Sequence, residues 1–326
     1  MAEGLTGAGD FELEVLDLVT VSGMRIDLTA SCMGITIFED IFSLALTGTI
    51  ALSDSFNLPS HGPILGQEYL YLKIRTPSFP NTTTTAIDFS ENVFLVHSIS
   101  TRKRLGDGVQ GYVLNFASQE LIKNQRLKVT QSLTGSWSDL VEQMVRGGKY
   151  LNTTKNLLVE RTGGVKRFVA PNIRPLDVVV LATKQAISQK GGEPTFLFYE
   201  TFDGFHFRSL ASLYNKLPSF LFETVPPGTN PPLGRGMNIA KQMETIINYE
   251  IVNNNDTIVG YRGGMYGSKL ITHDIVNKTY RINRYNYHDN FVSEPHIVSG
   301  TTAERTEYPF VSDLYVNKEG RVSDYL

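Results

Sequence analysis

The 326-residue sequence contains few combinations of residues that could do chemistry. None of its six histidines lies four residues from another, and Cys32 is its only cysteine. A zinc site needs several His or Cys ligands at close spacing, and a disulfide needs two cysteines. The sequence therefore predicts no metal site, no cofactor and no intrachain disulfide. A reducing compartment of synthesis fits the single cysteine.

Acidic pairs are a further route to catalysis, because a glycosidase works with two carboxylates. Glu200 and Asp203 flank a pair of aromatic segments, so the hypothesis of a polysaccharide hydrolase begins there. Structural roles explain both residues better: Asp203 precedes Gly204 in a turn, and Glu200 ends a strand. The neighbours His273 and Asp274 suggest a dyad, but adjacent strand residues point to opposite faces. We predict no catalytic residue.

Glycine and serine motifs give no stronger signal. The sequence has no Gly-x-Ser-x-Gly elbow, and Ser268 precedes a strand where that motif requires a helix. The pairs Gly163–Gly164 and Gly263–Gly264 are too short for a phosphate-binding loop. Turns that need a positive φ explain both pairs.

The composition limits the classes of partner. The chain has 30 basic and 33 acidic residues, and only 19% of its residues are charged. Nucleic-acid-binding domains usually show a basic excess, which is missing here. The first ten residues lack a basic start and an apolar run, and no stretch reaches the roughly 20 apolar residues of a membrane span. We expect a protein of the cytoplasm, or of a particle built there.

Residues 11 to about 130 show the period of two that is typical of strands. Apolar and polar residues alternate in five segments, and turn signals separate the segments closely. This pattern predicts an antiparallel barrel or sandwich. The apolar residues that carry the alternation are Phe11, Leu13, Val15, Met24, Ile26, Leu28, Leu44, Leu46, Ile50, Leu52, Leu70, Leu72, Ile74, Tyr112, Leu114 and Phe116.

The period changes after residue 130, which predicts a mixed α/β region. One helix should start at Trp137, with Ser136 as its N-cap and Asp139 in its first turn. A second should start with Pro175 in its first turn and run to about residue 188. An Asp-Gly pair between two aromatic segments then predicts a hairpin over 196–209. Residues 225–236 are rich in Pro and Gly and indicate a linker, and 269–287 predict a further hairpin.

Residues 246–291 carry the only family information. Within them stand the segments GGMYGS (263–268) and LITHD (270–274), followed by Asn286, Tyr287, Asn290 and Phe291. This stretch closely resembles the central baseplate hub proteins of contractile-tailed bacteriophages, notably those of T-even-like phages and cyanophages. The resemblance is strongest over 240–291 and looser over 11–222. The signature has no known chemistry, so we expect a structural role for Gly263, Gly264, Tyr266, Gly267, Ile271, Thr272, His273, Asp274, Tyr287 and Phe291.

The resemblance implies a specific assembly. Hub subunits of this family form a homotrimer, and each carries two barrels like the tail-tube subunit, so that six barrels match a sixfold tube and a threefold spike. The implied partners are the central spike protein, tail-tube or tube-initiator proteins, baseplate wedge proteins and the tape measure protein. DNA would pass through the channel without specific binding, and the spike partner would carry any cell-wall hydrolase. The expected location is the virion's tail baseplate, assembled in the host cytoplasm.

Together, the pattern and the resemblance predict a mainly β protein with an α/β part. The expected domains are a tube-like barrel over 1–130, a middle α/β domain over 131–224, a linker over 225–237, and a second tube-like domain with a polar tail over 238–326. The second barrel should have more strands than this last stretch offers; a shortened barrel, a smaller middle domain or a cut sequence would each explain it. The alternative functions are a spike-base or tube-adaptor component of another contractile injection system, and the polysaccharide hydrolase.

Overall fold

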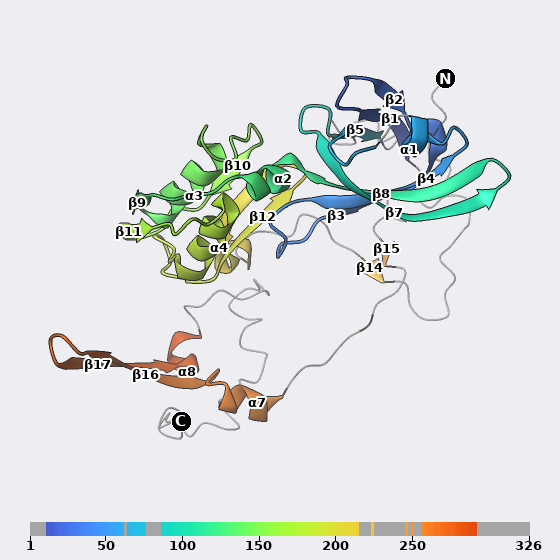
Figure 1. Ribbon diagram of the computed structural model, residues 1–326. Helices are drawn as coiled ribbons and strands as arrows, with labels where there is room; N and C mark the ends of the chain where they lie inside the picture. The colour runs from blue at the N-terminus through green and yellow to red at the C-terminus, as the bar shows by residue number, and fades with distance from the viewer. Residues whose placement is uncertain are drawn as a thin grey trace. The chain divides into compact units, whose positions relative to one another are not determined.

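The computed structural model describes residues 11–61, 64–75, 86–214, 223–224, 245–246, 250 and 256–291 of the chain. The chain forms two compact units, one with the described residues up to Leu210 and one with those from Ala211 onward. Most strands pair antiparallel, and three longer helices lie between residues 119 and 185 (Figure 1). The predicted class, mainly β with an α/β part, is confirmed.

The first sheet contains eight strands, and all of its pairings are antiparallel. Its strand order is β2-β1-β5-β7-β8-β4-β3, with β6 paired to β5. A 3₁₀ turn at Thr29–Ser31 and a short helix α1 at Leu58–His61 connect parts of the sheet. The strands are β1 Glu12–Val19, β2 Arg25–Asp27, β3 Cys32–Phe38, β4 Thr47–Asp54, β5 Tyr69–Arg75, β6 Ala86–Asp88, β7 Phe94–Gly106 and β8 Val109–Ser118.

This sheet does not close into the predicted barrel among the described strands. Its edges are β2 and β3, and no pairing joins them in the part of the chain that the structure describes. β2 has only three residues, which is too short to continue the ladder along the seven residues of β3. The edge of β3 therefore presents backbone groups that no described strand pairs.

The apolar residues of the predicted alternating pattern form most of the hydrophobic core of this sheet. Leu16, Leu18, Ile50, Leu52 and further residues are almost fully buried, and they pack with Phe94 and Phe116 into one hydrophobic cluster. Gly48 interrupts the apolar pattern because Phe116 occupies its side-chain space. A Cβ at position 48 would lie 2.3 Å from the Phe116 ring, so a larger residue would displace that ring.

The middle region holds the helices. α3 begins where the sequence predicts, and Ser136 and Asp139 form a reciprocal capping box at its start. α4 begins with Pro175 but ends at Gln185, three residues before the expected end, because Ala186 is extended and Ser188 bridges to Thr162. The elements are α2 Gln119–Arg126, β9 Ser132–Gly135, α3 Trp137–Arg146, β10 Leu157–Val159, β11 Lys166–Val169, α4 Pro175–Gln185, β12 Phe196–Thr201, β13 Gly204–Ser209 and α5 Leu210–Tyr214.

A second hydrophobic cluster holds this region together. Its largest member is Trp137 of α3, whose ring lies 6.1 Å from that of Phe168, and the cluster also contains residues of α4 and aromatic residues of β12 and β13. The strand order here is β10-β13-β12, with β10 parallel and β12 antiparallel to β13. The predicted aromatic hairpin is confirmed, with its turn at 202–203.

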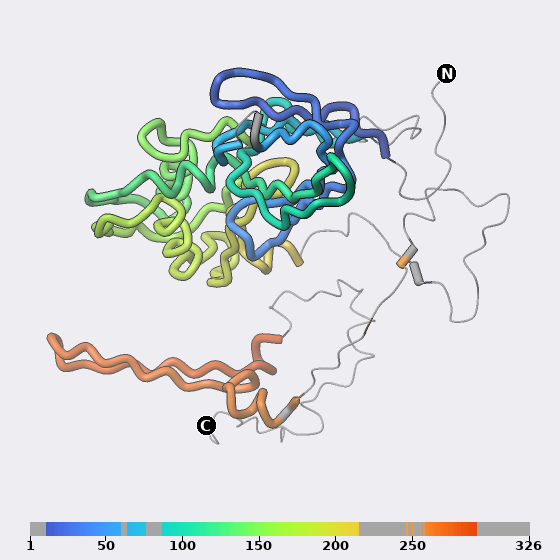
Figure 2. The backbone as a smooth tube through the Cα atoms, turned by 45° about the vertical axis from the view of Figure 1, so that its right-hand side comes forward, coloured from blue at the N-terminus to red at the C-terminus, as the bar shows by residue number. Residues whose placement is uncertain are grey.

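The second unit is built around one long hairpin. β16 Gly267–Asp274 and β17 Thr279–Asn286 pair over eight positions, between the short helices α7 Thr257–Arg262 and α8 Tyr287–Asn290. Figure 2 shows the two strands running side by side along their whole length. The hairpin predicted at 269–287 is confirmed. β14 Glu223–Thr224 and β15 Thr245–Ile246 form a short parallel pair. The predicted linker at 225–237 and the polar tail lie outside the described residues, and the predicted domain division stays a prediction.

Candidate functional site

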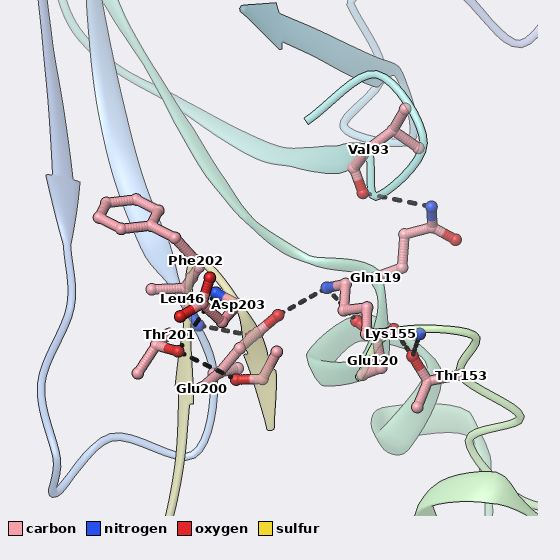
Figure 3. Close-up of polar contacts among 12 residues, drawn as sticks. Leu46, Val93, Gln119, Glu120, Thr153, Lys155, Glu200, Thr201, Phe202 and Asp203 are labelled. Carbon is pink, nitrogen blue, oxygen red and sulfur yellow. Dashed lines mark hydrogen bonds and ion pairs between the residues drawn. The ribbon is translucent and has the colours of Figure 1, made fainter. Parts of the chain in front are cut away.

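The acidic candidate Glu200 lies inside the first unit and not on its surface. It is the fifth residue of β12, and only 1% of its side chain is exposed. Its Oε1 accepts a hydrogen bond from Lys155 Nζ at 2.6 Å, and its Oε2 accepts one from the Leu46 amide at 2.8 Å (Figure 3). Both oxygens are therefore occupied by protein groups.

Lys155 joins Glu200 to a second buried carboxylate, Glu120. The Lys155 ammonium lies 2.8 Å from Glu120 Oε2, and the Thr153 hydroxyl donates to Glu120 Oε1 at 2.6 Å. The exposed fraction of the side chain is 7% for Lys155 and 5% for Glu120. The Lys155 ammonium also lies 5.5 Å from the centre of the Phe205 ring. We call the set Glu120, Thr153, Lys155 and Glu200 the buried charge network (Figure 3).

The network joins the two hydrophobic clusters of the first unit. Glu120 comes from the first turn of α2, and Lys155 from the loop before β10. Leu46, whose amide binds Glu200, belongs to the cluster of the first sheet, whereas Phe205 belongs to the cluster of the middle region. Burying ions is favourable only when each has partners, and here each has at least two.

Burial and the neighbouring charges shift the two carboxylates in opposite directions. Burial raises the pKa of Glu200 above its usual value, and Lys155 offsets this only in part. Burial also disfavours the charged form of Glu120, but Lys155 and the Thr153 hydroxyl outweigh it and hold the pKa of Glu120 below its usual value. The negative charge of Glu120 adds to the effect of burial at Glu200. Glu200 is therefore the more easily protonated carboxylate of the network.

Asp203, unlike Glu200, is exposed to solvent. It is exposed in the hairpin turn at the end of β12, and its amide donates to the Thr201 hydroxyl at 3.3 Å. The adjacent Phe202 amide donates to Glu39, and the Phe202 ring lies 5.8 Å from that of Phe89. The turn thus contacts the first sheet. The structure does not bring Glu200 and Asp203 into the pair of open carboxylates that a hydrolase would need.

The family-signature residues of the second unit separate into two groups, of which the first builds the base of the hairpin. The ring of Tyr266 lies 4.9 Å from Tyr261 and 6.0 Å from Tyr287, and Tyr287 lies 5.3 Å from Phe291. The Tyr287 amide also donates to the Tyr266 carbonyl at 3.0 Å. Burial among these rings raises the pKa of Tyr287. Gly263 and Gly264 form the turn before Tyr266, and Gly267 is buried at the start of β16.

Gly264 explains why the signature needs glycine at that turn. Its φ is +73°, in the left-handed region that side chains with a Cβ rarely adopt. This turn directs the chain from α7 back past Tyr261, so that the Tyr266 ring lies tilted against the Tyr261 ring. The glycine turn and the aromatic rings thus hold the base of the hairpin together, and the structural role expected for the signature residues stays a prediction.

The second group of signature residues, 271–274, lies along β16. Asp274 accepts hydrogen bonds from the amides of Val276 and Asn277 at 2.9 and 3.1 Å and from the Asn277 side chain at 2.7 Å, which closes the turn. His273 pairs across the strands with Tyr280, with ring centres 6.2 Å apart. His273 and Asp274 thus have different partners and form no dyad.

The hairpin is exposed on both of its faces. Every residue from Ser268 to Arg284 is exposed, including Ile271 at 46% and Tyr280 at 69%. The turn residues Ile275 and Val276 are each 89% exposed. Exposed apolar side chains gathered on one element mark an interaction surface. The exposed large apolar residues of the hairpin are Leu270, Ile271, Ile275, Val276, Tyr280 and Ile282.

Two functional features were not found from the sequence. Glu120 and Lys155 lie 80 and 45 positions from Glu200, so no local motif could reveal the buried charge network. The pairing of Lys269 with Arg284 was missed because it depends on the four-residue turn at 275–278, and the sequence pattern did not fix the length of that turn.

Within the described residues, no group of three or more His, Cys, Asp or Glu side chains could hold a metal ion. None of the described helices is long and apolar enough to cross a membrane.

No protein-family model matches the chain, and no curated protein matches it. Several solved structures are similar to it. They include the 43 kDa tail protein of prophage MuSo2 from Shewanella oneidensis, with 8% identity and a TM-score of 0.42 over 66% of this chain and 58% of that one. A tail protein from Neisseria meningitidis MC58 has 9% identity and a TM-score of 0.44 over 83% and 67% of the two chains.

A third similar structure is a Francisella PdpA-VgrG complex, with 12% identity and a TM-score of 0.39 over 68% of this chain and 33% of that one. The chain thus spans less than two thirds of the MuSo2 tail protein and about a third of the chain matched in the complex. Two of these neighbours are tail proteins, and all three share 12% or less of their residues with this chain. Its function rests on its own residues.

Proposed function

We propose that this chain is a structural subunit of the central hub of a contractile phage baseplate. In this proposal three copies form a ring that adapts the sixfold tail tube to the threefold spike and lets DNA pass during ejection. One observation carries it. The signature segment folds into a hairpin that its own aromatic residues support at the base, and that presents apolar side chains on both faces.

Such a hairpin is a poor element for a protein that works alone. A two-stranded sheet is marginally stable in water unless one of its faces is covered. Here the large apolar residues Leu270, Ile271 and Ile282 are all exposed. An assembly subunit gains from this arrangement, because a partner that covers the hairpin both stabilises it and becomes bound.

The proposed structural role includes no enzymatic activity. The best acidic candidate, Glu200, is almost fully buried, and both of its oxygens accept hydrogen bonds from the protein. A general acid must reach the glycosidic oxygen of its substrate, and this carboxylate has no surface to offer. The alternative of a polysaccharide hydrolase therefore loses its starting residue.

The proposed partners follow from the hub role. They are two further copies of the chain, the central spike protein, the tail-tube or tube-initiator proteins, the wedge proteins of the baseplate and the tape measure protein. The net charge of −3 supports a channel that DNA can pass, because phosphate binding depends on Lys and Arg. The proposed place of the chain is the tail baseplate of the virion.

The test is the mass of the purified chain, measured by native mass spectrometry and sedimentation, together with its symmetry in assembled tails. We expect a trimer of 36.3 kDa subunits and threefold density below the tube. A stable monomer that never enters tails, or a hexamer, would refute the threefold adaptor. A threefold ring in an injection system without a phage head would favour the alternative of a spike-base component.

A separate assay addresses the hydrolase. Purified peptidoglycan should not be solubilised by the wild-type chain, and Glu200→Gln should behave in the same way. Lysis by the wild type that Glu200→Gln abolishes would overturn the non-enzymatic proposal.

A further inference from the structure

One face of the β16–β17 hairpin carries two like charges that repel each other across the strands. Residues directly opposite in an antiparallel pair share a face, so Lys269 and Arg284 stand side by side, followed by Ile271 with Ile282 and His273 with Tyr280. Like charges directly opposite destabilise a strand pair. We call this set of six residues the cationic face.

No described residue relieves this repulsion. Among the residues that the structure describes, no carboxylate forms an ion pair with Lys269 or Arg284. The hairpin from 267 to 286 contains four Lys or Arg side chains and one Asp, in a chain whose net charge is −3. The cationic face is therefore complementary to an acidic surface that also carries apolar groups.

The first unit presents such a surface at the end of β3. Segment 38–42 contains Glu39 and Asp40 between exposed apolar residues: Phe38 is 53% exposed and Phe42 is 76% exposed. Asp40 holds the local turn by accepting from the Phe42 amide at 2.9 Å, and Glu39 accepts from the Phe202 amide at 3.2 Å. Neither carboxylate has a cationic partner among the described residues. The segment also continues the edge strand β3.

We propose that the cationic face of one copy docks on segment 38–42 of a second copy of this chain. Lys269 and Arg284 then face Glu39 and Asp40, while Ile271 and Ile282 cover Phe38 and Phe42. The contact joins two different surfaces, and a repeated contact of this kind closes into a ring when its rotation allows. The inference rests on the proposed function, because it names the surfaces that would hold the three copies together.

Charge reversal tests the contact in the full chain. Lys269→Glu with Arg284→Glu should weaken association at least about tenfold, measured by sedimentation equilibrium, because like charges then face each other. Combining it with Glu39→Lys and Asp40→Lys should restore association. Lys166→Glu with Arg167→Glu, an exposed pair on β11, is the matched control and should leave association unchanged. Circular dichroism should show that every variant is folded.

Cross-linking identifies the occupant. One preparation carries Cys32→Ser and Ile271→Cys, and the other carries Cys32→Ser and Phe42→Cys. Mixing and oxidising the two should give a disulfide-linked dimer of one chain from each. If instead a chain with both cysteines cross-links only within itself, the hairpin docks on its own first unit and the proposal is overturned.

The two proposals fail in different ways. A wild-type trimer that the hairpin variant leaves intact refutes this contact and leaves the hub standing. The same holds if the hairpin variant stays trimeric but loses binding to a tail partner, because the face then belongs to that partner. A wild-type chain that remains a monomer at all concentrations and never enters assembled tails refutes the hub itself.

Discussion

The buried charge network and the cationic face use the same chemistry in opposite ways. In the network one lysine lies between two carboxylates, and every charged group has at least two partners. On the cationic face two basic side chains stand opposite each other, and no described carboxylate pairs with either. The first arrangement is complete within its unit, whereas the second has no oppositely charged partner among the described residues.

The difference separates stability from recognition. Charges that are buried and fully paired fix one geometry, and removing a single partner leaves an ion without compensation. Exposed charges contribute little to stability but can direct association with an oppositely charged surface. Substitutions in the two regions should therefore change different measurements.

The largest effect is expected for Lys155→Met, because it leaves Glu120 and Glu200 buried without their shared cation. We expect a loss of about 3 to 5 kcal/mol in the free energy of unfolding, measured with urea. Lys166→Met, at an exposed position of β11, should change it by less than about 0.5 kcal/mol. A loss below about 1 kcal/mol for Lys155→Met would show that the network is not closed to water.

The pH dependence of the free energy of unfolding should reveal which carboxylate has a raised pKa. The pKa of Glu200 is raised by burial, so the folded state keeps its proton at pH values where the unfolded state has lost it. The stability that this proton contributes is fully present below the ordinary Glu value of 4.5 and is lost as the pH rises through the higher folded value. Glu200→Gln should remove this part of the decline. The free energy of unfolding, measured with urea at several pH values, should then fall less steeply above pH 4.5. If it falls as steeply in Glu200→Gln as in the wild type, the assignment to Glu200 is wrong.

The opposite shift of Glu120 should act in a separate pH range. Its lowered pKa contributes stability that is present above 4.5 and is lost as the pH falls through the folded value. Glu120→Gln should therefore flatten the acid side of the curve. It also removes a negative charge that raises the pKa of Glu200, so the decline above pH 4.5 should become shallower as well. An acid side as steep as that of the wild type in urea unfolding would contradict the assignment to Glu120.

A smaller effect is expected at the start of α3. Ser136→Ala removes the hydroxyl that accepts from the Asp139 amide at 3.2 Å, and the loss should be about 1 kcal/mol. Ser132→Ala on the exposed side of β9 is the matched control. An equal effect of both substitutions in thermal unfolding would mean that the capping box does not stabilise the helix.

The smallest effect, and the one that separates the two regions most sharply, is expected for Lys269→Glu. It replaces the repulsive pair with an opposite-charge pair, so the hairpin should gain about 0.2 to 1 kcal/mol. Amide hydrogen exchange of β16 and β17, measured below the concentration at which copies associate, should slow down. Lys278→Glu in the turn changes the same charge without touching the pair. Faster exchange in Lys269→Glu would show that Lys269 and Arg284 do not repel.

Local patterns predicted the elements well. The capping residue Ser136, the Pro175 start of α4 and the turn before Gly204 each act within a few residues, and each is where the sequence placed it. Helix α2 was missed because Gln119–Arg126 directly follows β8 and its apolar face is narrow. The closure of the first sheet was predicted and is not seen, because it depends on the length of β2 and not on any pattern in the other strands.

The candidate site was harder to predict for a physical reason. The structural role of Glu200 depends on Lys155 and Leu46, which come close to it only when the chain folds. A strand-end carboxylate that is free to act and one that is paired in a core look the same in sequence. The hairpin at 269–287 was predicted, but the sequence pattern did not show that both of its faces are exposed.

The hydrogen bond from the Leu46 amide to Glu200 also bears on the order of synthesis. It joins residues 154 positions apart, so the start of β4 leaves the ribosome long before its partner exists. Until β12 has been made, that amide can be satisfied only by water, and the first sheet lacks one of its connections to the middle region. Chains released after β8 but before β12 should therefore be more exposed to chaperones and proteases than complete chains.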